Sequence, residues 1–462
     1  MLLQSLLRPV LTPLMRGMFD APIASSAAWS PIALWPDGIL SPGMWISPRD
    51  LTSEWADYTG TTPVVTPGTV ADSSNPVGLA LDIRAGATVL TDPGNHMLQS
   101  TSAARPLLSA RVNLLTSTED LSNLYVYSPQ FSTVSAPTYP DPFGANSANK
   151  FTGDASSNVH RLLGDTVVGE SVLSLYVKTG ELRRIGLLLG NPFAGAWFDL
   201  TSGTAGVLSD YPDVIDYGIE PAENGFYRCW IHCSITSTTS QGRQMFLLPD
   251  GGTSFGSGGF AADAVGVYVT GAQLELGSTT TPYQSVPGDG STYATDFPIF
   301  QKYDGVDDGM ATAAFTAGAL INGMDCMIPV RRDSAAACVA GLYNGIADAT
   351  KFFGMAESAS GSGCVGSGAG TPTVWVDGVQ LSGGTAVTRG TLHTALTVGD
   401  YHILEFRGLD LSTWTAAGFG LYTSYLFPGP RGDIMLYPST ASTEDKDAAR
   451  QWLADYYGVT LP

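Results

Sequence analysis

The stretch TVADSSNPVGLALDIRAGATVLTDPGNHMLQSTSAARP, residues 69–106, reads as the opening of a domain made of short strands. Its apolar residues come in brief runs between Gly, Pro, Asn and Asp, which is typical of strands joined by tight turns. The stretch ends before enough strands have passed to enclose a core. The rest of this domain must therefore lie elsewhere in the chain.

Composition limits the classes of fold and partner. The chain has 462 residues, with 54 Gly, 29 Pro and only 14% charged residues, which favours a mainly β protein of several domains. The net charge of −20 argues against nucleic acid as a partner, because proteins that bind phosphate backbones concentrate Lys and Arg. No run of about 18 apolar residues occurs, so no insertion into a membrane is expected.

The cysteines favour a protein that folds in a reducing compartment. There are five of them, an odd number without CxxC spacing, so neither a disulfide framework nor a zinc site is indicated. In YRCWIHCSI, residues 227–235, strand alternation places Tyr227, Cys229, Ile231 and Cys233 on one face. We expect these thiols to be buried and reduced.

Residues 1–25 are predicted to be a docking segment. Apolar residues recur there at helical spacing, although prolines interrupt the run: Leu3, Leu7, Leu11, Leu14 and Met18. A signal peptide is the alternative, but its basic residues should precede the apolar run, whereas Arg8 and Arg16 lie within it. We expect contact with sister chains or with another protein. Residues 26–68, rich in Trp and Pro, are expected to form an extended arm over a neighbouring surface.

Two sets of predicted strands follow, separated by a surface connector at residues 287–298. In the second set, TVWVDGVQL predicts a hairpin with Asp377 and Gly378 in a two-residue turn. The chain closes with a predicted amphipathic helix. Ser442 or Thr443 is expected to cap its N-terminus, and Gly458 is expected to end it.

The first set resembles a carbohydrate-binding-module-like jelly roll that is common in bacteriophage and prophage appendage proteins. The resemblance lies in NLLTSTEDLSN at 113–123, in Ser174, Tyr176, Val177 and Lys178, in Phe226, Tyr227 and Arg228, and in GVYVTGAQLELGSTTTPYQSV at 266–286. It implies an antiparallel β-sandwich over residues 107–290.

The second set resembles a concanavalin-like (laminin-G-like) lectin sandwich of the same kind of protein. YDGVDDGM at 303–310, VWVDGVQ at 374–380, GDIMLYPST at 432–440 and the closing helix carry this resemblance. In that family the YDGVDD strand commonly follows segments that match residues 75–82, 94–96 and 104–106. The resemblance therefore implies that residues 69–106 are the first part of this sandwich, that 107–290 are inserted, and that 291–462 complete it. The loop after Asp82, Ile-Arg-Ala-Gly-Ala, departs from the family pattern.

One acidic segment is a candidate metal site. Asp304, Asp307 and Asp308 in YDGVDD are expected to form a turn held by Asx-type hydrogen bonds, or a calcium-binding loop. A catalytic carboxylate pair is a third interpretation, since glycosidases need two carboxyl groups across a sugar. Apart from calcium, no cofactor is expected.

The remaining motifs do not indicate an enzyme. The five histidines lack metal-ligand spacing, no nucleophile elbow is present, and the glycine-rich segments lack the lysine of a phosphate loop. The Arg431-Gly432-Asp433 tripeptide is expected to be a chance occurrence at the start of a strand.

Sugar recognition would use aromatic side chains that stack on the apolar face of the ring. The candidates for this role are Trp197, Tyr211, Trp230, Trp375, Tyr401, Trp414 and Tyr422. About half are expected to be core residues, because aromatic side chains on strand faces usually are.

We therefore expect a non-enzymatic virion protein of a phage or prophage, a tail fibre, tail tip or spike, assembled in the bacterial cytoplasm as a homotrimer. Its N-terminus would contact other virion proteins, and its sandwiches would bind host-surface polysaccharide. The alternatives are a capsid-attached head fibre or decoration protein, an architectural baseplate or collar protein without a ligand, and a polysaccharide depolymerase.

Overall fold

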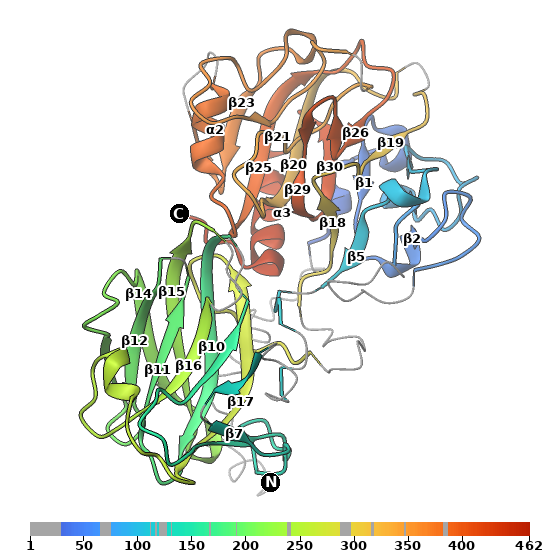
Figure 1. The fold of residues 1–462 in the computed structure, drawn as a ribbon. Coiled ribbons are helices and arrows are strands. Elements are labelled where there is room, and N and C mark those ends of the chain that lie inside the picture. Colours follow the sequence, from blue (N-terminus) through green and yellow to red (C-terminus); the bar gives the residue numbers. More distant parts are fainter. Residues whose placement is uncertain are drawn as a thin grey trace, which may run out of the picture.

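The computed structural model describes residues 29–64, 75–286 and 297–462, apart from gaps at 111, 116–117, 120–126, 131, 166–167, 191, 238–241, 316–317, 346–347 and 382–386. The fold is mainly β, and every strand pair within the sheets is antiparallel. Figure 1 shows two bodies. One, the central module, comprises strands β6–β17 (residues 127–276); the other, the flanking module, is built from residues on both sides of it.

The central module consists of two six-stranded sheets that share a core. The first sheet runs β14 (Asp216–Pro221), β15 (Tyr227–Ile235), β10 (Gly169–Thr179), β17 (Gly266–Leu276), β8 (Asn149–Gly153) and β7 (Ser132–Val134). The second runs β13 (Thr204–Val207), β12 (Ala194–Asp199), β11 (Arg184–Leu189), β16 (Arg243–Leu248), β9 (Arg161–Gly164) and β6 (Tyr127–Gln130). Alternate residues such as Leu173 and Leu175 of β10 meet Ile185 and Leu187 of β11 in this core.

The flanking module is built around a nine-stranded sheet. Its path is β24 (Val379–Gln380), β23 (Thr373–Val376), β25 (Tyr401–Asp410), β20 (Asn322–Arg331), β29 (Pro428–Arg431), β18 (Phe300–Asp304) and β5 (Leu107–Ser109), with β30 (Ile434–Pro438) joining β20 to β1 (Met44–Ile46). A five-stranded sheet faces it: β2 (Glu54–Trp55), β3 (Leu79–Ala80), β4 (Met97–Leu98), β19 (Met310–Thr312) and β26 (Gly418–Phe419). Two short pairs complete the strands: β21 (Cys338–Val339) with β22 (Met355–Ala356), and β27 (Leu421–Tyr422) with β28 (Tyr425–Leu426).

Two α-helices of the flanking module lie within the described ranges. Helix α3 (Thr443–Tyr457) begins after Ser442, whose hydroxyl accepts a hydrogen bond from Asp445 N, and ends at Gly458 in the left-handed conformation, as the sequence predicts. It covers the face of the nine-stranded sheet that points away from the main core. The shorter helix α2 (Arg389–Ala395), capped by Thr388, was not predicted from the sequence.

Segments before and after the central module pair with each other. Strand β4 pairs with β19, and β5 pairs with β18, so residues near 97 and 107 lie beside residues near 311 and 301. Because Leu108 is buried in the flanking core, the expected boundary at 106/107 falls too early. At the other side of the junction, Gln284 Oε1 accepts hydrogen bonds from Val112 N and Asn113 N, which holds the two ends of the central module together.

The two modules also touch at a second point. Gly277 and Gly399 both have positive φ, and a Cβ on Gly399 would lie only 2.4 Å from Gly277 N. Ser278 N also donates to Asp400 Oδ1 at 3.4 Å. Glycine is required here because the two backbones approach too closely for any side chain.

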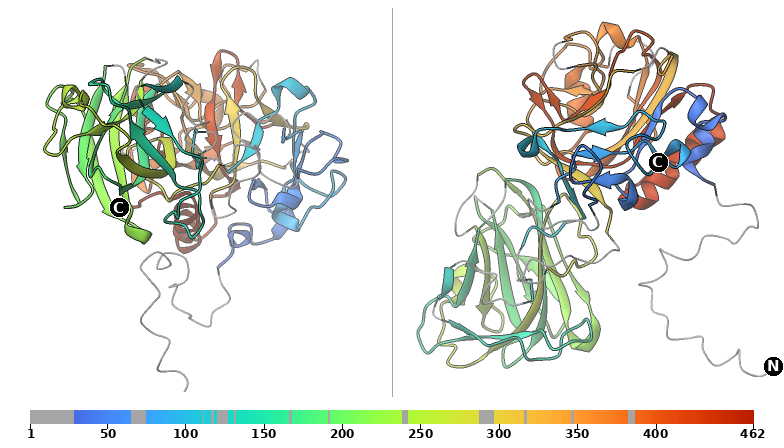
Figure 2. Two further views of the ribbon diagram at one scale, coloured as in Figure 1. Left: turned by 60° about the horizontal axis from the view of Figure 1, so that its bottom comes forward. Right: turned by 90° about the vertical axis from the view of Figure 1, so that its right-hand side faces the viewer.

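The expectation of an extended arm at residues 26–68 is wrong for the part that the structure describes. Residues 29–64 form the 3-10 turns η2 (Pro31–Leu34), η3 (Gly38–Leu40) and η4 (Leu51–Ser53) and the strands β1 and β2 of the flanking sheets. Trp35 is buried and donates its indole N–H to Leu436 O. Figure 2 shows this segment in blue beside the red helix α3. Burial of the tryptophans against the chain's own sheet explains their number.

The remaining 3-10 turns lie in loops: η5 (Ile83–Ala85), η6 (Ser102–Ala104), η7 (Glu223–Gly225), η8 (Phe255–Gly258) and η9 (Ser367–Ala369). The hairpin at Asp377 and Gly378 is confirmed, since Val376 pairs with Val379 and both turn residues have positive φ. The five cysteines are free and buried, as predicted.

Candidate functional site

The outer face of the β14–β15–β10 sheet presents the strongest candidate, Trp230. Strand β15 alternates, so Cys229 and Ile231 enter the core of the central module while Trp230 points outward. Its cross-strand partner on β14 is Gly218, and its partner on β10 is Ser174. The indole is half-buried.

The indole of Trp230 lies directly over Gly218. A Cβ on Gly218 would lie 2.6 Å from Nε1, Cε2 and Cζ2 of the indole. Glycine in a strand interior often marks such a close approach. Among the described residues, no aromatic ring or cationic side chain is stacked on Trp230, and its indole Nε1 is buried without a hydrogen-bond partner.

Polar side chains border this indole along β15. Arg228 is buried and donates from Nη2 to Ser174 Oγ at 3.1 Å, while its Nε has no hydrogen-bond partner. His232 Nε2 lies 3.5 Å from Glu170 Oε2 and also lacks a hydrogen bond. Buried polar atoms without partners are costly, and they often accompany binding sites.

The other half of the same sheet face is closed by the chain itself. Glu275 Oε2 accepts a hydrogen bond from Thr281 Oγ1 at 2.6 Å, and Gln273 Oε1 accepts one from Gln284 N at 2.8 Å. Burial raises the pKa of the Glu275 carboxyl above its usual range. The segment after β17 therefore covers β17, and the open part of the face is the β14–β15 side around Trp230.

Trp230 was predicted from the sequence as a candidate, whereas the residues around it were not. The alternation that places Cys229 and Ile231 inward also places Arg228, Trp230 and His232 outward, so the group was readable from YRCWIHCSI. Gly218 in DYGIEP carried a signal too, as a glycine inside a strand. The pairing of β14 with β15 was not predictable from the sequence, because the strand register depends on the tertiary structure.

Two of the expected glycan-binding residues are core residues, which is a correction. Trp414 is 5% exposed, packs against Phe353 and donates its indole N–H to Gly368 O. Tyr422 is 3% exposed, and its hydroxyl donates to Asp348 O at 2.7 Å. Neither ring face is free to stack on a sugar.

Four further candidates are half-buried, and their rings already have partners. The Arg184 guanidinium lies 4.5 Å from the ring centre of Trp197. The Arg407 guanidinium lies 4.4 Å from the ring centre of Trp375. The ring centres of Tyr401 and Tyr457 lie 5.3 Å apart, and the Tyr401 hydroxyl is buried. Tyr211 makes edge contacts with Phe193 and Phe255, each with ring centres 5.8 Å apart. Trp230 is thus the candidate with an unoccupied ring.

The acidic turn forms a compact group of carboxylates. Asp304 Oδ1 accepts hydrogen bonds from Val306 N at 2.7 Å and from Asp307 N at 3.3 Å, and Asp308 Oδ2 accepts one from Asp304 N at 2.8 Å. Oxygens of Asp304, Asp307 and Asp308 lie within 4.8 Å of one another, close enough to hold a calcium ion. The hydrogen bonds of the turn account for the same geometry without an ion, so both interpretations stand.

Burial raises the pKa of Asp308 to about 7, and the neighbouring charges of Asp304 and Asp307 raise it further. Of the three acids, Asp304 lines a cavity of about 360 Å³, together with Lys302, Asp333 and Ser334. Asp304, Asp307 and Asp308 belong to one turn, so these three carboxylates do not oppose one another across a sugar.

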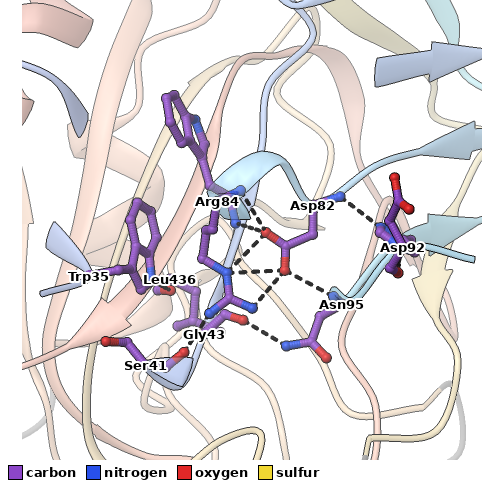
Figure 3. Close-up of polar contacts among 10 residues, drawn as sticks. Trp35, Ser41, Gly43, Asp82, Arg84, Asp92, Asn95 and Leu436 are labelled. Carbon is purple, nitrogen blue, oxygen red and sulfur yellow. Dashed lines mark hydrogen bonds and ion pairs between the residues drawn. The ribbon is translucent and has the colours of Figure 1, made fainter. Parts of the chain in front are cut away.

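Residues Asp82, Asn95 and His96, which match the lectin-like pattern, form a structural network with Arg84 of the loop that departs from it. Figure 3 shows Asp82 between Arg84 and Asn95. The Asp82 carboxylate accepts hydrogen bonds from Arg84 Nη2 at 2.7 Å, Asn95 N at 2.9 Å and Trp45 N at 3.1 Å. His96 Nδ1 accepts one from Asp82 N at 2.9 Å, which leaves the proton on Nε2 to donate to Asp92 O.

This network ties the 29–64 segment to the loop after β3. Arg84 donates to Ser41 O, and Asn95 Nδ2 donates to Gly43 O (Figure 3). Asp82 is fully buried and Arg84 nearly so, which leaves no open face for a ligand. The role of these residues is to fix the architecture.

Thr397, His402 and Asp377 are hydrogen-bonded in the order of a catalytic triad of nucleophile, base and acid. His402 Nδ1 lies 2.7 Å from Asp377 Oδ2, and His402 Nε2 lies 2.8 Å from Thr397 Oγ1. The amide of Thr397, however, also donates to His402 Nε2 at 3.1 Å. The histidine therefore caps the loop before β25, and its lone pair is already used by the backbone. Arg431 and Asp433 of the RGD tripeptide are fully buried, so the tripeptide is structural.

No protein-family model matches the chain, and no curated protein matches it. Within the described ranges, no helix has the length and apolar character needed to cross a membrane. The docking residues expected at Leu3, Leu7, Leu11, Leu14 and Met18 lie outside the described residues.

Proposed function

We propose that this protein is a structural appendage of a bacteriophage or prophage particle, a tail fibre, tail tip or spike, that binds host-surface glycans. In this proposal the central module is a jelly roll of the carbohydrate-binding-module type, and the flanking module is a concanavalin-like sandwich. The sequence resemblances support both assignments. Residues 1–25 dock into the virion, and the protein assembles as a homotrimer in the bacterial cytoplasm.

The observation that carries the binding proposal is the uncovered indole of Trp230. It is half-buried, lies over Gly218 and has no stacked partner among the described residues. An indole held in this way offers a rigid apolar surface to the face of a sugar ring and costs little conformational entropy on binding. Affinity per site is modest, and three linked copies raise it through avidity.

The test is binding of the full-length protein to host cells and to a glycan array, with and without calcium. Replacement of Trp230 by Ala should weaken binding at least about tenfold, the loss expected for a central aromatic anchor. Trp375→Ala is the matched control, because that indole already carries Arg407. Equal binding by both variants would exclude the Trp230 surface as the site.

The same assay separates the alternatives. Shortening of the polysaccharide during binding would indicate a depolymerase. Absence of saturable binding to any glycan or cell would favour an architectural protein of a baseplate or collar. Labelling of residues 1–60 in intact particles would distinguish attachment to the tail from attachment to the capsid.

A further inference from the structure

Three tryptophans of this chain share one arrangement, in which a guanidinium lies on the indole and a carboxylate holds the guanidinium. The distance from the guanidinium carbon to the ring centre is 4.5 Å for Arg184 on Trp197 and 4.4 Å for Arg407 on Trp375. It is 3.3 Å for Arg49 on Trp452. Arg184 pairs with Asp199 at 2.9 Å, and Arg407 pairs with Glu405 at 2.6 Å. Arg49 pairs with Asp433 at 3.3 Å. Cations are attracted to indole faces by the quadrupole of the ring, and the carboxylate fixes the cation in place.

Trp230 has the indole and the carboxylates of this arrangement but lacks its cation. On β14, Asp216 and Glu220 are two residues before and after Gly218, the partner of Trp230, and all three side-chain positions face outward. Such diagonal cross-strand neighbours lie about 7–8 Å apart, within reach of long side chains. Asp216 and Glu220 are both exposed and flank the strand position opposite the indole, and their own direct cross-strand partners on β15 are His232 and Arg228.

The other charged groups of this face do not supply the missing cation. Arg228 is buried, donates to Ser174 and lies toward Tyr176, and no ion pair joins it to Glu220 among the described residues. His232 lies beside Glu170, whose side chain is half exposed. The exposed charges around the Trp230 ring are thus carboxylates, in a protein whose net charge is −20.

We infer that the Trp230 surface selects saccharides that carry a protonated amine, as deacetylated amino sugars do. This inference rests on the proposed glycan-binding function and names the class of glycan. The ammonium group of the ligand lies on the indole between Asp216 and Glu220, where the guanidinium lies in the other three sites. Anionic polysaccharides are disfavoured, since their carboxylates or phosphates would face carboxylates of the protein.

The experiment compares two β-1,4-linked hexasaccharides with the same backbone, the glucosamine hexamer with protonated amines and the N-acetylglucosamine hexamer with neutral acetamides. Both are titrated into the full-length protein by calorimetry, at a pH at which the free amines are protonated. We expect the glucosamine hexamer to bind at least about tenfold more tightly, and its affinity to fall with added salt. Similar affinities of the two hexamers would overturn the inference and leave glycan binding intact.

Variants assign the preference to the carboxylates of Asp216 and Glu220. The double variant Asp216→Asn, Glu220→Gln should lose the preference for the amine and keep the affinity for the neutral hexamer. Asp250→Asn is the matched control, because Asp250 is an exposed carboxylate that pairs with Arg183 away from this face. A double variant that keeps the preference would also overturn the inference.

Two further outcomes are separable. If neither hexamer binds but host cells do, the amine preference is overturned and the proposed cell binding stands. If the unmodified protein binds neither hexamer, array glycan nor cell, the proposed function itself fails.

Discussion

Trp230 on β15 and Gly218 on β14 are cross-strand partners, and the indole of the first fills the space that a side chain on the second would take. Gly218→Ala should therefore displace the indole from the sheet. We expect the variant to remain folded, with a cost of about 1–3 kcal/mol from overpacking, and to lose glycan binding to the same degree as Trp230→Ala. Thermal unfolding and cell-binding assays measure the two effects.

The other sheet of the central module provides the control for this prediction. Gly206 is the partner of Trp197, and its Cβ would lie 2.5 Å from that indole. Gly206→Ala should lower stability by a similar amount and leave binding unchanged, because Arg184 occupies the Trp197 ring. Loss of binding in both variants would mean that the effect arises from general destabilisation of the module.

Asp82 should be among the residues most important for the stability of the flanking module. Asp82→Ala leaves the buried Arg84 without its carboxylate and removes the acceptor for Trp45 N and Asn95 N. Loss of one partner of a buried ion pair typically costs about 3–5 kcal/mol. In calorimetry, the unfolding transition of the flanking module should move to lower temperature while that of the central module stays. A single transition that moves as a whole would show that the two modules unfold together.

Stability should also depend on pH through two buried acids. Burial raises the pKa of Glu54 from 4.5 to about 8 and that of Asp308 from 3.8 to about 7. Each group is protonated in the fold over a range in which the unfolded chain is ionised. The contribution of each group to the free energy of unfolding is complete below its pKa in the unfolded chain. It is lost as the pH rises toward 8 for Glu54 and toward 7 for Asp308.

Glu54→Gln isolates the first contribution, since Gln imitates the neutral acid and still accepts the hydrogen bond from Gln301 Nε2. The variant should lose less stability than the unmodified protein between pH 5 and pH 8, as measured by thermal unfolding across that range. Glu223→Gln, at an exposed site, serves as the comparison. An unchanged slope in the Glu54 variant would show that this carboxyl is ionised in the fold.

The proposed insertion predicts independent folding of the central module. A polypeptide of residues 110–290 retains both ends that Gln284 ties together, with Val112 N and Asn113 N as donors. We expect cooperative unfolding and the circular dichroism of a β protein. An unfolded polypeptide, alongside a folded chain of residues 1–290, would contradict the insertion.

Local signals of the sequence predicted local structure well. The hairpin at Asp377 and Gly378 follows from turn chemistry, and α3 follows from its caps at Ser442 and Gly458, because both depend on neighbouring residues. Pairings over long sequence distances were a different matter. The pairing of β4 with β19 was expected only because of the family resemblance, and that of β1 with β30 was missed.

The candidate site shows the same division. Alternation indicates which way a strand residue points, but it does not indicate what lies on top of it. Trp197 and Trp230 both point outward from their sheets, and only the tertiary structure places Arg184 on one of them and leaves the other uncovered. Trp414 belongs to a turn, where no periodicity separates a core residue from an exposed one.

The side-by-side ends of the central module have a consequence for how such proteins change. Because the chain leaves and re-enters the flanking module at adjacent points, a different guest could occupy this position without altering the path of the host sheets. In an appendage of the kind proposed above, recognition and attachment would then evolve separately, and exchange of the central module alone would change the receptor that is bound while the anchor stays the same.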